Sequence, residues 1–494
     1  MKQSDDLFEL IRSLDAGEKT YFRKHAGLHV REGGNKYMLL FDAMERQKKY
    51  DEKKLITKFR SEKFTRQFSV AKNYLYNLLL ESLEAKHRSV EAELNSRIEQ
   101  IDILFHKRLY LQAQKKIIAA KALAGKFEKY AHLILIAERE ITLISHQRYE
   151  GKSMEDISTL FTIALDASNN KTEILLYWQS ISLIFQHIKQ KGGYVRTKED
   201  RDKFEAIITG SVLKQGQHAK SFMARFFYYS CMIGYYYSIA DYEKMLFFSE
   251  GQVRLLDENP HLAGEIRQSI VNSLLNLTLA QLGSGHYDKV PATIQRMREV
   301  EPSSEHVRKL IFEQTSTMEA QLYVLTKDFG KALQVYEHVE SVFRESGNTL
   351  QPFQMPLFFF CKAVVMYNLG DLREAGRLLN LGLNESGLDY RSDLHCFAKI
   401  FSLVIHYELG NQDLLDSIIR STYRYLLNRK RLYIFETLVL DFIRKRLPPA
   451  GSGERTKEAF RWLYTEFIKL NKDPFERNAF EYFDYIDWLE KKTR

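Results

Sequence analysis

The chain has 494 residues, of which 45 % are hydrophobic and 28 % charged, and its formal net charge is +9 at pH 7. This hydrophobic share is ample for a continuous packed core. No stretch reaches the roughly 18 apolar residues that a membrane-spanning helix needs, and the first residues lack the basic and apolar regions of a secretory signal.

The pattern along the chain favours an all-helical protein. The 8 prolines and 24 glycines fall mostly between periodic segments, and no run alternates β-branched with polar residues. The three cysteines, Cys231, Cys361 and Cys396, lie within apolar helical patterns and lack metal-ligand spacing. Buried free thiols are typical of a reducing compartment, so we expect a cytoplasmic location.

Residues 1–90 predict an N-terminal helical domain or cap. Several short amphipathic segments are followed by a long one, FTRQFSVAKNYLYNLLLESLEAKHR. Asp15 and Glu18 frame the start of the second segment, as N-terminal capping residues do. We expect the last helix of this domain to dock on the helices that follow.

Residues 91–446 read as paired helices, of which 357–386 is the clearest pair. Its first helix places apolar residues at i, i+3, i+4 and i+7, which are Phe360, Ala363, Val364 and Tyr367. It stops at Gly370, and Asp371 with Glu374 forms a capping-box pattern for the second helix. One such hairpin cannot bury both of its faces, so it needs neighbours on either side.

The turn positions of these pairs recur at a long period. The equivalent place is held by Tyr110, Tyr242, Tyr287, Phe329, Leu372 and Gln412. The last five of these residues are 45, 42, 43 and 40 residues apart, and the gap of 132 before them is three such periods. We therefore expect two further units near Met154 and Lys198, and another at Glu454.

The hairpin at 357–386 resembles the tetratricopeptide repeat family. The residues that carry the resemblance are Phe359, Ala363, Gly370, Leu372, Ala375 and Leu379. Lys362 departs from the pattern, and the family's usual unit is shorter, at about 34 residues. The chain is also similar to bacterial proteins that join a helical N-terminus to degenerate repeats. The resemblance implies a right-handed superhelix of antiparallel helix pairs.

The segment LPPAGSG at 447–453 predicts a linker, since two prolines and two glycines cannot extend a helix. Residues 447–494 are then expected to form a C-terminal helical cap. The prediction is thus three parts: 1–90, the repeat array 91–446, and the cap.

A search for reactive constellations yields none. The sequence contains no CxxC, HExxH, GxxxxGK[ST] or GxSxG motif. We therefore predict no catalytic residue, no metal site and no cofactor, and we expect the protein not to be an enzyme.

The resemblance implies an interaction scaffold. In that family the first helices line a concave groove that holds a peptide. The equivalent positions here are Tyr237, Thr317, Gln321, Tyr367 and Asn368. We expect these residues to bind a peptide or protein partner through aromatic anchors and a few polar contacts.

Positive charge gathers in two regions, which opens an alternative. Residues 1–90 carry 19 Lys and Arg against 13 Asp and Glu, and residues 420–446 carry 8 against 2. Either region is ordinary solvated surface or a patch that attracts nucleic acid or an acidic protein. Residues 51–77 look like two helices across a short turn, and the side chains able to contact DNA are Lys53, Lys54, Arg66, Gln67, Lys72 and Asn73. The alternative function is a transcriptional regulator with a DNA-binding N-terminal domain and a peptide-sensing repeat array.

Overall fold

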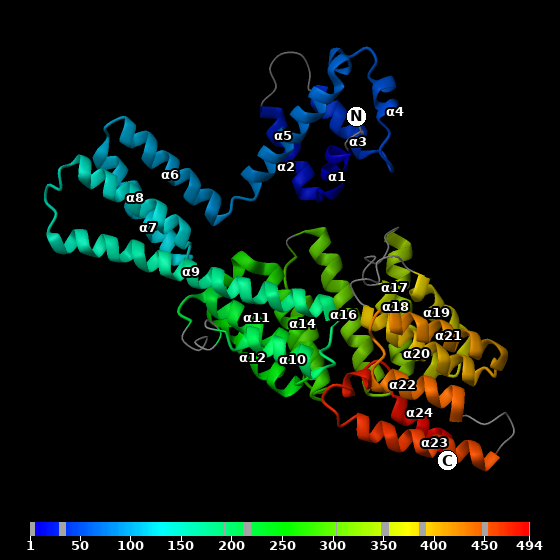
Figure 1. Ribbon diagram of the computed structural model, residues 1–494. Coiled ribbons are helices and arrows are strands. Elements are labelled where there is room, and N and C mark those ends of the chain that lie inside the picture. The colour runs from blue at the N-terminus through cyan, green and yellow to red at the C-terminus, as the bar shows by residue number, and fades with distance from the viewer. Residues whose placement is uncertain are drawn as a thin grey trace. The chain divides into compact units, whose positions relative to one another are not determined.

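The structure is a computed structural model. It describes residues 5–28, 36–191, 193–210, 213, 219–302, 304–346, 355–384, 392–446 and 453–493. All secondary structure in these ranges is helical, which confirms the all-α prediction. The chain divides into two compact units (Figure 1). Unit 1 comprises Met1–Ser168 and Pro302–Arg308, and unit 2 comprises Asn169–Glu301 and Lys309–Arg494.

The N-terminal helices of unit 1 pack around a small core of their own. They are α1 (Asp6–Ser13), α2 (Ala16–Leu28), α3 (Lys36–Glu45), α4 (Glu52–Lys58), the 3-10 turn η1 (Lys63–Gln67) and α5 (Phe68–Lys86). Ile11, Phe41 and Leu75 are fully buried there. The predicted cap of the second helix is confirmed, because the Glu18 amide donates to Asp15 at 2.6 Å and the Asp15 amide donates to Glu18 at 2.8 Å.

Three helices of similar length follow in unit 1. They are α6 (Val90–His106), α7 (Tyr110–Lys126) and α8 (Tyr130–His146). Ala113, Ala120 and Ala124 on α7 are fully buried. Their small side chains let the backbones of neighbouring helices approach closely, and Ile117 fills the remaining space between them.

Helix α9 (Met154–Lys191) is 38 residues long and crosses the boundary between the units at Ser168. It begins where a second helix of a pair is expected and continues through the place of the next first helix. The Asn169–Asn170–Lys171 stretch contains neither Gly nor Pro, so nothing in it ends the helix. Within unit 2 its later turns pack on α11, where Tyr177 lies edge-on to Tyr228.

Unit 2 continues as a succession of helix pairs (Figure 1). The elements up to the middle of the unit are α10 (Lys198–Ile208), α11 (Phe222–Ser238), α12 (Tyr242–Glu258), α13 (Pro260–Ala263), η3 (Gly264–Ile266), α14 (Arg267–Gly283), α15 (Val290–Arg298), α16 (Glu305–Leu325), which belongs to this unit from Lys309 on, and α17 (Phe329–Ser346). The remaining elements are α18 (Met355–Asn368), α19 (Leu372–Asn384), α20 (Ser392–Glu408), α21 (Gln412–Asn428), α22 (Ile434–Asp441), the π turn η5 (Phe442–Arg446), α23 (Gly453–Leu470), η6 (Arg477–Phe480) and α24 (Tyr485–Thr493).

The hairpin turns at the six predicted turn positions share one backbone conformation. Two residues before each predicted turn position the backbone φ is positive, at Arg108, Ala240, Gly285, Lys327, Gly370 and Gly410. The next amide then bonds back to the preceding helix, as Asp371 does to the Met366 carbonyl at 3.0 Å. This is the Schellman arrangement that ends many helices. Helices also begin at Met154 and Lys198, as the period predicts.

The capping box of the hairpin at 357–386 is only half formed. The Glu374 amide donates to Asp371 Oδ1 at 3.0 Å, so the cap itself is confirmed. The Glu374 carboxylate, however, accepts two hydrogen bonds from Arg377, at 2.6 and 2.7 Å, instead of reaching back to the cap. The nearby guanidinium is the stronger partner for a carboxylate.

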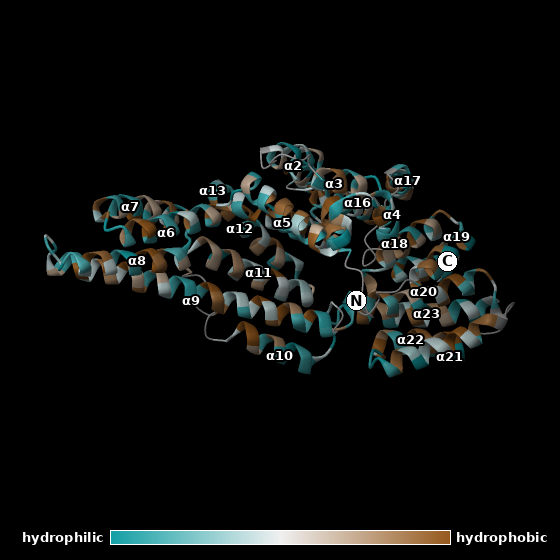
Figure 2. Ribbon diagram, turned by 90° about the horizontal axis from the view of Figure 1, so that it is seen from above, coloured by the Kyte–Doolittle hydropathy of each residue, from teal (hydrophilic) through white to brown (hydrophobic). Residues whose placement is uncertain are grey.

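The largest core lies under α18–α24 in unit 2. Phe401, Phe435 and Phe467 are fully buried in it. Hydrophobic and hydrophilic residues alternate around the helices (Figure 2), as burial of one face requires. Of the predicted linker 447–453, residues 447–452 lie outside the described residues and Gly453 begins α23. The limits of the three expected parts stay a prediction.

Candidate functional site

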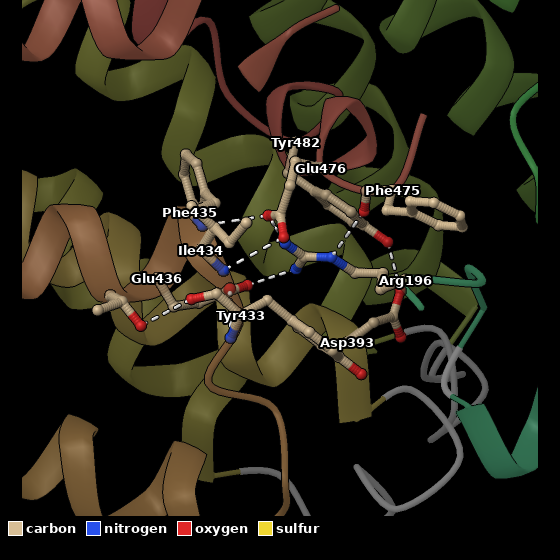
Figure 3. A network of polar contacts seen from close by, with 10 residues as sticks. Arg196, Asp393, Tyr433, Ile434, Phe435, Glu436, Phe475, Glu476 and Tyr482 are labelled. Atoms are coloured by element: carbon tan, nitrogen blue, oxygen red, sulfur yellow. Dashed lines mark hydrogen bonds and ion pairs between the residues drawn. The ribbon is translucent and has the colours of Figure 1, made fainter. Parts of the chain in front are cut away.

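A buried ion cluster lies where three distant parts of unit 2 meet. Arg196, between α9 and α10, is only 6 % exposed. Its Nη1 donates to Glu436 Oε1 and its Nη2 to Glu476 Oε2, both at 2.5 Å, while Nε donates to the Phe475 carbonyl at 3.3 Å. Figure 3 shows the guanidinium between the two carboxylates. Every nitrogen of the guanidinium is thus satisfied within the protein.

The two carboxylates are positioned by the start of α22. The amides of Ile434 and Phe435 donate to Glu476 at 3.2 and 3.1 Å. The Tyr433 amide donates to Glu436 Oε2 at 3.2 Å. The amides at a helix start have no partner within the helix, so Glu476 caps α22 from a separate part of the chain.

Burial and charge act in opposite directions on this cluster. Burial alone would lower the pKa of Arg196, but the charges of Glu436 and Glu476 outweigh it and raise that pKa. Burial raises the pKa of Glu436, and the attraction of Arg196 only partly offsets it. The cluster therefore holds one cation against two carboxylates in a water-poor interior.

The segment that carries Glu476 makes further polar contacts with unit 2. We call residues 471–493 the C-terminal segment. Arg477 donates to the Ile239 and Ala240 carbonyls at 2.9 and 2.7 Å, at the turn before α12. Glu481 accepts hydrogen bonds from Tyr194 and Tyr242, both at 2.6 Å. The segment thus binds helix ends that lie more than two hundred residues earlier.

Two more anchors hold the segment to α20. Tyr482 donates to Asp393, a contact also seen in Figure 3. Glu408, at the end of α20, accepts from Trp488 Nε1 and from Lys492 Nζ, each at 2.7 Å. Both ends of this helix are therefore bound by the C-terminal segment.

Aromatic rings fill the space under the segment. The Phe483 ring lies 5.2 Å from Tyr367 and 4.6 Å from Phe401, and Tyr482 stacks on Phe397 at 4.5 Å. These partners sit on α18 and α20, the first helices of their pairs. Helices α18 and α20 therefore already hold a stretch of irregular chain against their aromatic side chains.

A cleft of about 440 Å³ opens beside the ion cluster. It is lined by Arg196, Leu432, Tyr433, Ile434, Thr437, Leu438, Asp473, Phe475 and Glu476. The Ile434 side chain is 56 % exposed at its rim. The Asp473 carboxylate accepts from the Phe475 amide at 2.7 Å. This lining suits an apolar side chain near a guanidinium.

Within the described ranges, no group of three or more His, Cys, Asp or Glu side chains is arranged to hold a metal ion. Cys231 and Cys396 are buried, and burial raises the pKa of each thiol to about 12. Burial also lowers the pKa of His395, beside Cys396, to about 4. These two neighbours are therefore poorly suited to act as thiolate and base.

The expected groove residues on α11 and α18 lie against other side chains. Tyr237 is half-buried with its ring 5.4 Å from Tyr194. Tyr367 packs on Phe483, and burial raises its pKa. Asn368 donates to the carbonyl of Val364 in its own helix at 2.8 Å.

The other two expected groove residues lie one turn apart on α16. Thr317 donates to the Glu313 carbonyl at 2.8 Å, and Gln321 is half-buried. No hydrogen bond or ring contact of the described residues joins this pair to Tyr237 or Tyr367. That all five residues line one groove stays a prediction.

The expected DNA-contacting residues fall into two groups. Lys53, Lys54, Arg66, Gln67 and Asn73 are exposed on α4, η1 and α5. Lys72 is different, because its Nζ donates to Glu52 at 2.5 Å and to the Tyr50 hydroxyl at 3.1 Å. Lys72 is thus engaged inside unit 1.

The ion cluster had little signal in the sequence. Glu436 lies early in the largely apolar run IFETLVLDF, which hints at a buried carboxylate. Arg196 and Glu476 lie in connecting segments, where charge is ordinary. Their pairing depends on segments 240 and 280 residues apart.

Comparison with known proteins adds no relative. No protein-family model matches the sequence, and no curated protein matches it.

Among the described helices, none is long and apolar enough to cross a membrane.

Proposed function

We propose that this protein is a non-enzymatic scaffold that binds an extended segment of a partner protein on the helix pairs of unit 2. The observation that supports it is the binding of the C-terminal segment itself. Phe483 and Tyr482 insert between first helices, and Arg477 and Glu481 bind helix ends. A surface that accepts one irregular segment through aromatic anchors has the chemistry to accept another.

We further propose a tetratricopeptide-like repeat type and a cytoplasmic location. The repeat type is supported by the six turns of shared conformation and by hairpins about forty residues apart. The location is supported by Cys231, Cys361 and Cys396, which are free thiols.

The partner segment is proposed to place an apolar side chain in the cleft beside Arg196. Leu432, Ile434 and Leu438 provide the apolar contact, and the cleft volume of about 440 Å³ falls in the range of ligand sites. The buried guanidinium is already paired, so it supplies no free charge to the partner. Affinity would therefore come mainly from burial of apolar surface.

The test compares two substitutions of equally exposed residues. Ile434 is 56 % exposed at the cleft, and Leu414 on α21 is 52 % exposed away from its lining. Ile434→Asp and Leu414→Asp variants are used as bait for affinity capture from the native host. Proteins that bind the wild type and Leu414→Asp but are lost with Ile434→Asp would support the proposal. If Ile434→Asp retains every protein that Leu414→Asp retains, the cleft is not the binding site.

A double variant tests the expected groove without disturbing the packing. Tyr367→Phe keeps the ring that packs on Phe483 and removes only the hydroxyl. Combined with Gln321→Ala, it should weaken partner binding while helicity stays unchanged. Unchanged binding would show that these two polar groups do not contact the partner.

A further inference from the structure

Positive charge in unit 1 is concentrated in one short stretch. Residues 53–80 contain seven Lys and Arg and a single acidic residue, Glu62. The stretch runs from the second residue of α4, just after Glu52, through the turn and η1 to Leu80, about two thirds of the way along α5. Such a density of one sign creates a strong local potential.

The cations of unit 1 differ in whether they form an ion pair. Outside this stretch, Arg23 pairs with Asp42 and Glu45, and Lys86 pairs with Asp15. Within it, Lys72 pairs with Glu52. The exposed cations of the stretch that make no ion pair with any described residue are Lys53, Lys58, Arg60, Lys63 and Arg66. Their charge is directed at solvent and is available to a ligand.

This cationic surface is held in a fixed shape. The rings of Phe59, Phe64 and Phe68 follow one another at 5.5 and 6.5 Å under the turn. The Thr65 hydroxyl donates to the Phe59 carbonyl at 2.5 Å. Asp51 caps α4 by accepting from the Lys54 amide at 3.0 Å. A fixed arrangement loses less conformational entropy when it binds a ligand.

The exposed face of α5 continues the cationic surface with neutral polar groups. Gln67 and Ser69 are exposed at its start, and Asn73 and Asn77 follow one turn apart. No acidic residue occurs on α5 before Glu81. Amide side chains both donate and accept hydrogen bonds, as the edges of DNA bases do.

We propose that this surface binds duplex DNA. Lys53, Arg60, Lys63 and Arg66 contact backbone phosphates, and α5 presents Asn73 and Asn77 to a groove. The charge is complementary to phosphate, and a row of amides beside the cations matches base edges better than it matches a carboxylate-rich protein. Lys72 takes no part, because Glu52 already neutralises it.

The experiment measures binding of the full-length protein to a fluorescent 25-base-pair DNA duplex over a series of salt concentrations. One variant replaces Lys53, Arg60, Lys63 and Arg66 by Gln. The matched control replaces four exposed cations of the other basic region, Arg420, Arg424, Lys430 and Arg444, by Gln. None of the eight side chains forms an ion pair with a described residue, so circular dichroism and thermal midpoints should stay close to those of the wild type.

The wild type and the control should bind in low salt, with affinity that falls steeply as salt rises. The N-terminal variant should bind at least about tenfold more weakly, and its log–log salt slope should be smaller by about 3 to 4. Polyglutamate at equal charge should compete poorly. Absence of wild-type binding at about 50 mM salt would overturn the proposal. So would an equal loss in the control variant, or displacement by polyglutamate as effective as that by DNA.

Discussion

The Arg196 guanidinium and the Glu476 carboxylate are 280 residues apart in the sequence and 2.5 Å apart in the fold. Glu436 completes the cluster from a third segment. Two carboxylates and one guanidinium thus hold together the loop between α9 and α10, the start of α22 and the C-terminal segment. A cluster this deeply buried is costly when it is incomplete, because an unpaired charge is left in a medium of low polarity.

We expect Arg196→Met to lower the free energy of unfolding by about 3 to 5 kcal/mol, because both carboxylates lose their cation. Urea denaturation followed by circular dichroism measures this change. The triple variant Arg196→Met, Glu436→Gln, Glu476→Gln should recover a large part of the loss, since it buries no charge. A triple variant no more stable than the single one would show that the charges are not the cause.

The stability of unit 2 should depend on pH through Glu436. Its pKa is raised in the folded state by burial, against Arg196, while the repulsion of Glu476 adds to the rise. A raised pKa means that the folded state binds the proton more tightly than the unfolded state. The stabilising contribution is therefore complete below the ordinary pKa near 4.5 and is lost as the pH rises through the folded value.

The wild type should consequently gain stability relative to Glu436→Gln as the pH falls from 7 towards 5. The gain is at most about 1.4 kcal/mol per pH unit for a single proton. Parallel urea titrations of the two proteins at several pH values measure the difference between them. A constant difference across this range would contradict the raised pKa.

The buried cysteines should resist thiol reagents in the native protein. The pKa of Cys231 and of Cys396 is about 12, so almost no thiolate exists at pH 8. Ellman's reagent should therefore titrate no more than one thiol, at half-buried Cys361, until denaturant is added. Cys361→Ala should remove even that reaction. Rapid labelling of two or more thiols in the native wild type would contradict the described burial.

Arg108 offers a test of the shared turn conformation. Its φ is 59°, in the region that costs ordinary residues about 1 kcal/mol and costs glycine little. Arg108→Gly should leave stability unchanged or raise it by up to about 1 kcal/mol. Lys107 is also exposed but has a φ of −80°, so Lys107→Gly should lower stability by roughly 0.5 to 1 kcal/mol. Thermal unfolding of the two variants should shift in opposite directions or differ clearly in size.

The positions of the hairpins could be predicted because their signals are local. A residue of positive φ two places before a helix start recurs at the six turns named above, and helices also begin at Met154 and Lys198, where the spacing of apolar residues is weak. The unbroken α9 was not predicted. The only sign of it in the sequence is that Asn169–Lys171 contains no Gly or Pro that would end the helix.

The contacts of the C-terminal segment could not be predicted, for a physical reason. Charged residues in connecting segments are ordinarily solvated, and nothing next to Arg196 in the sequence shows that two carboxylates approach it from segments 240 and 280 residues away. The same limit applies to Lys72. In the sequence it resembles Arg66, and only the fold shows that Glu52 pairs with one of them and not the other.

The capping of α22 by the distant residue Glu476 also has a consequence for synthesis. At about 5 to 20 residues per second, the ribosome adds Glu476 roughly 14 to 56 s after Arg196, because 280 residues separate them. Throughout that interval the guanidinium lacks its second carboxylate, and while the last 42 residues before Glu476 are added the start of α22 also lacks its cap. The last hairpins can therefore assemble fully only late in translation. Until then their hydrophobic faces are exposed and accessible to chaperones.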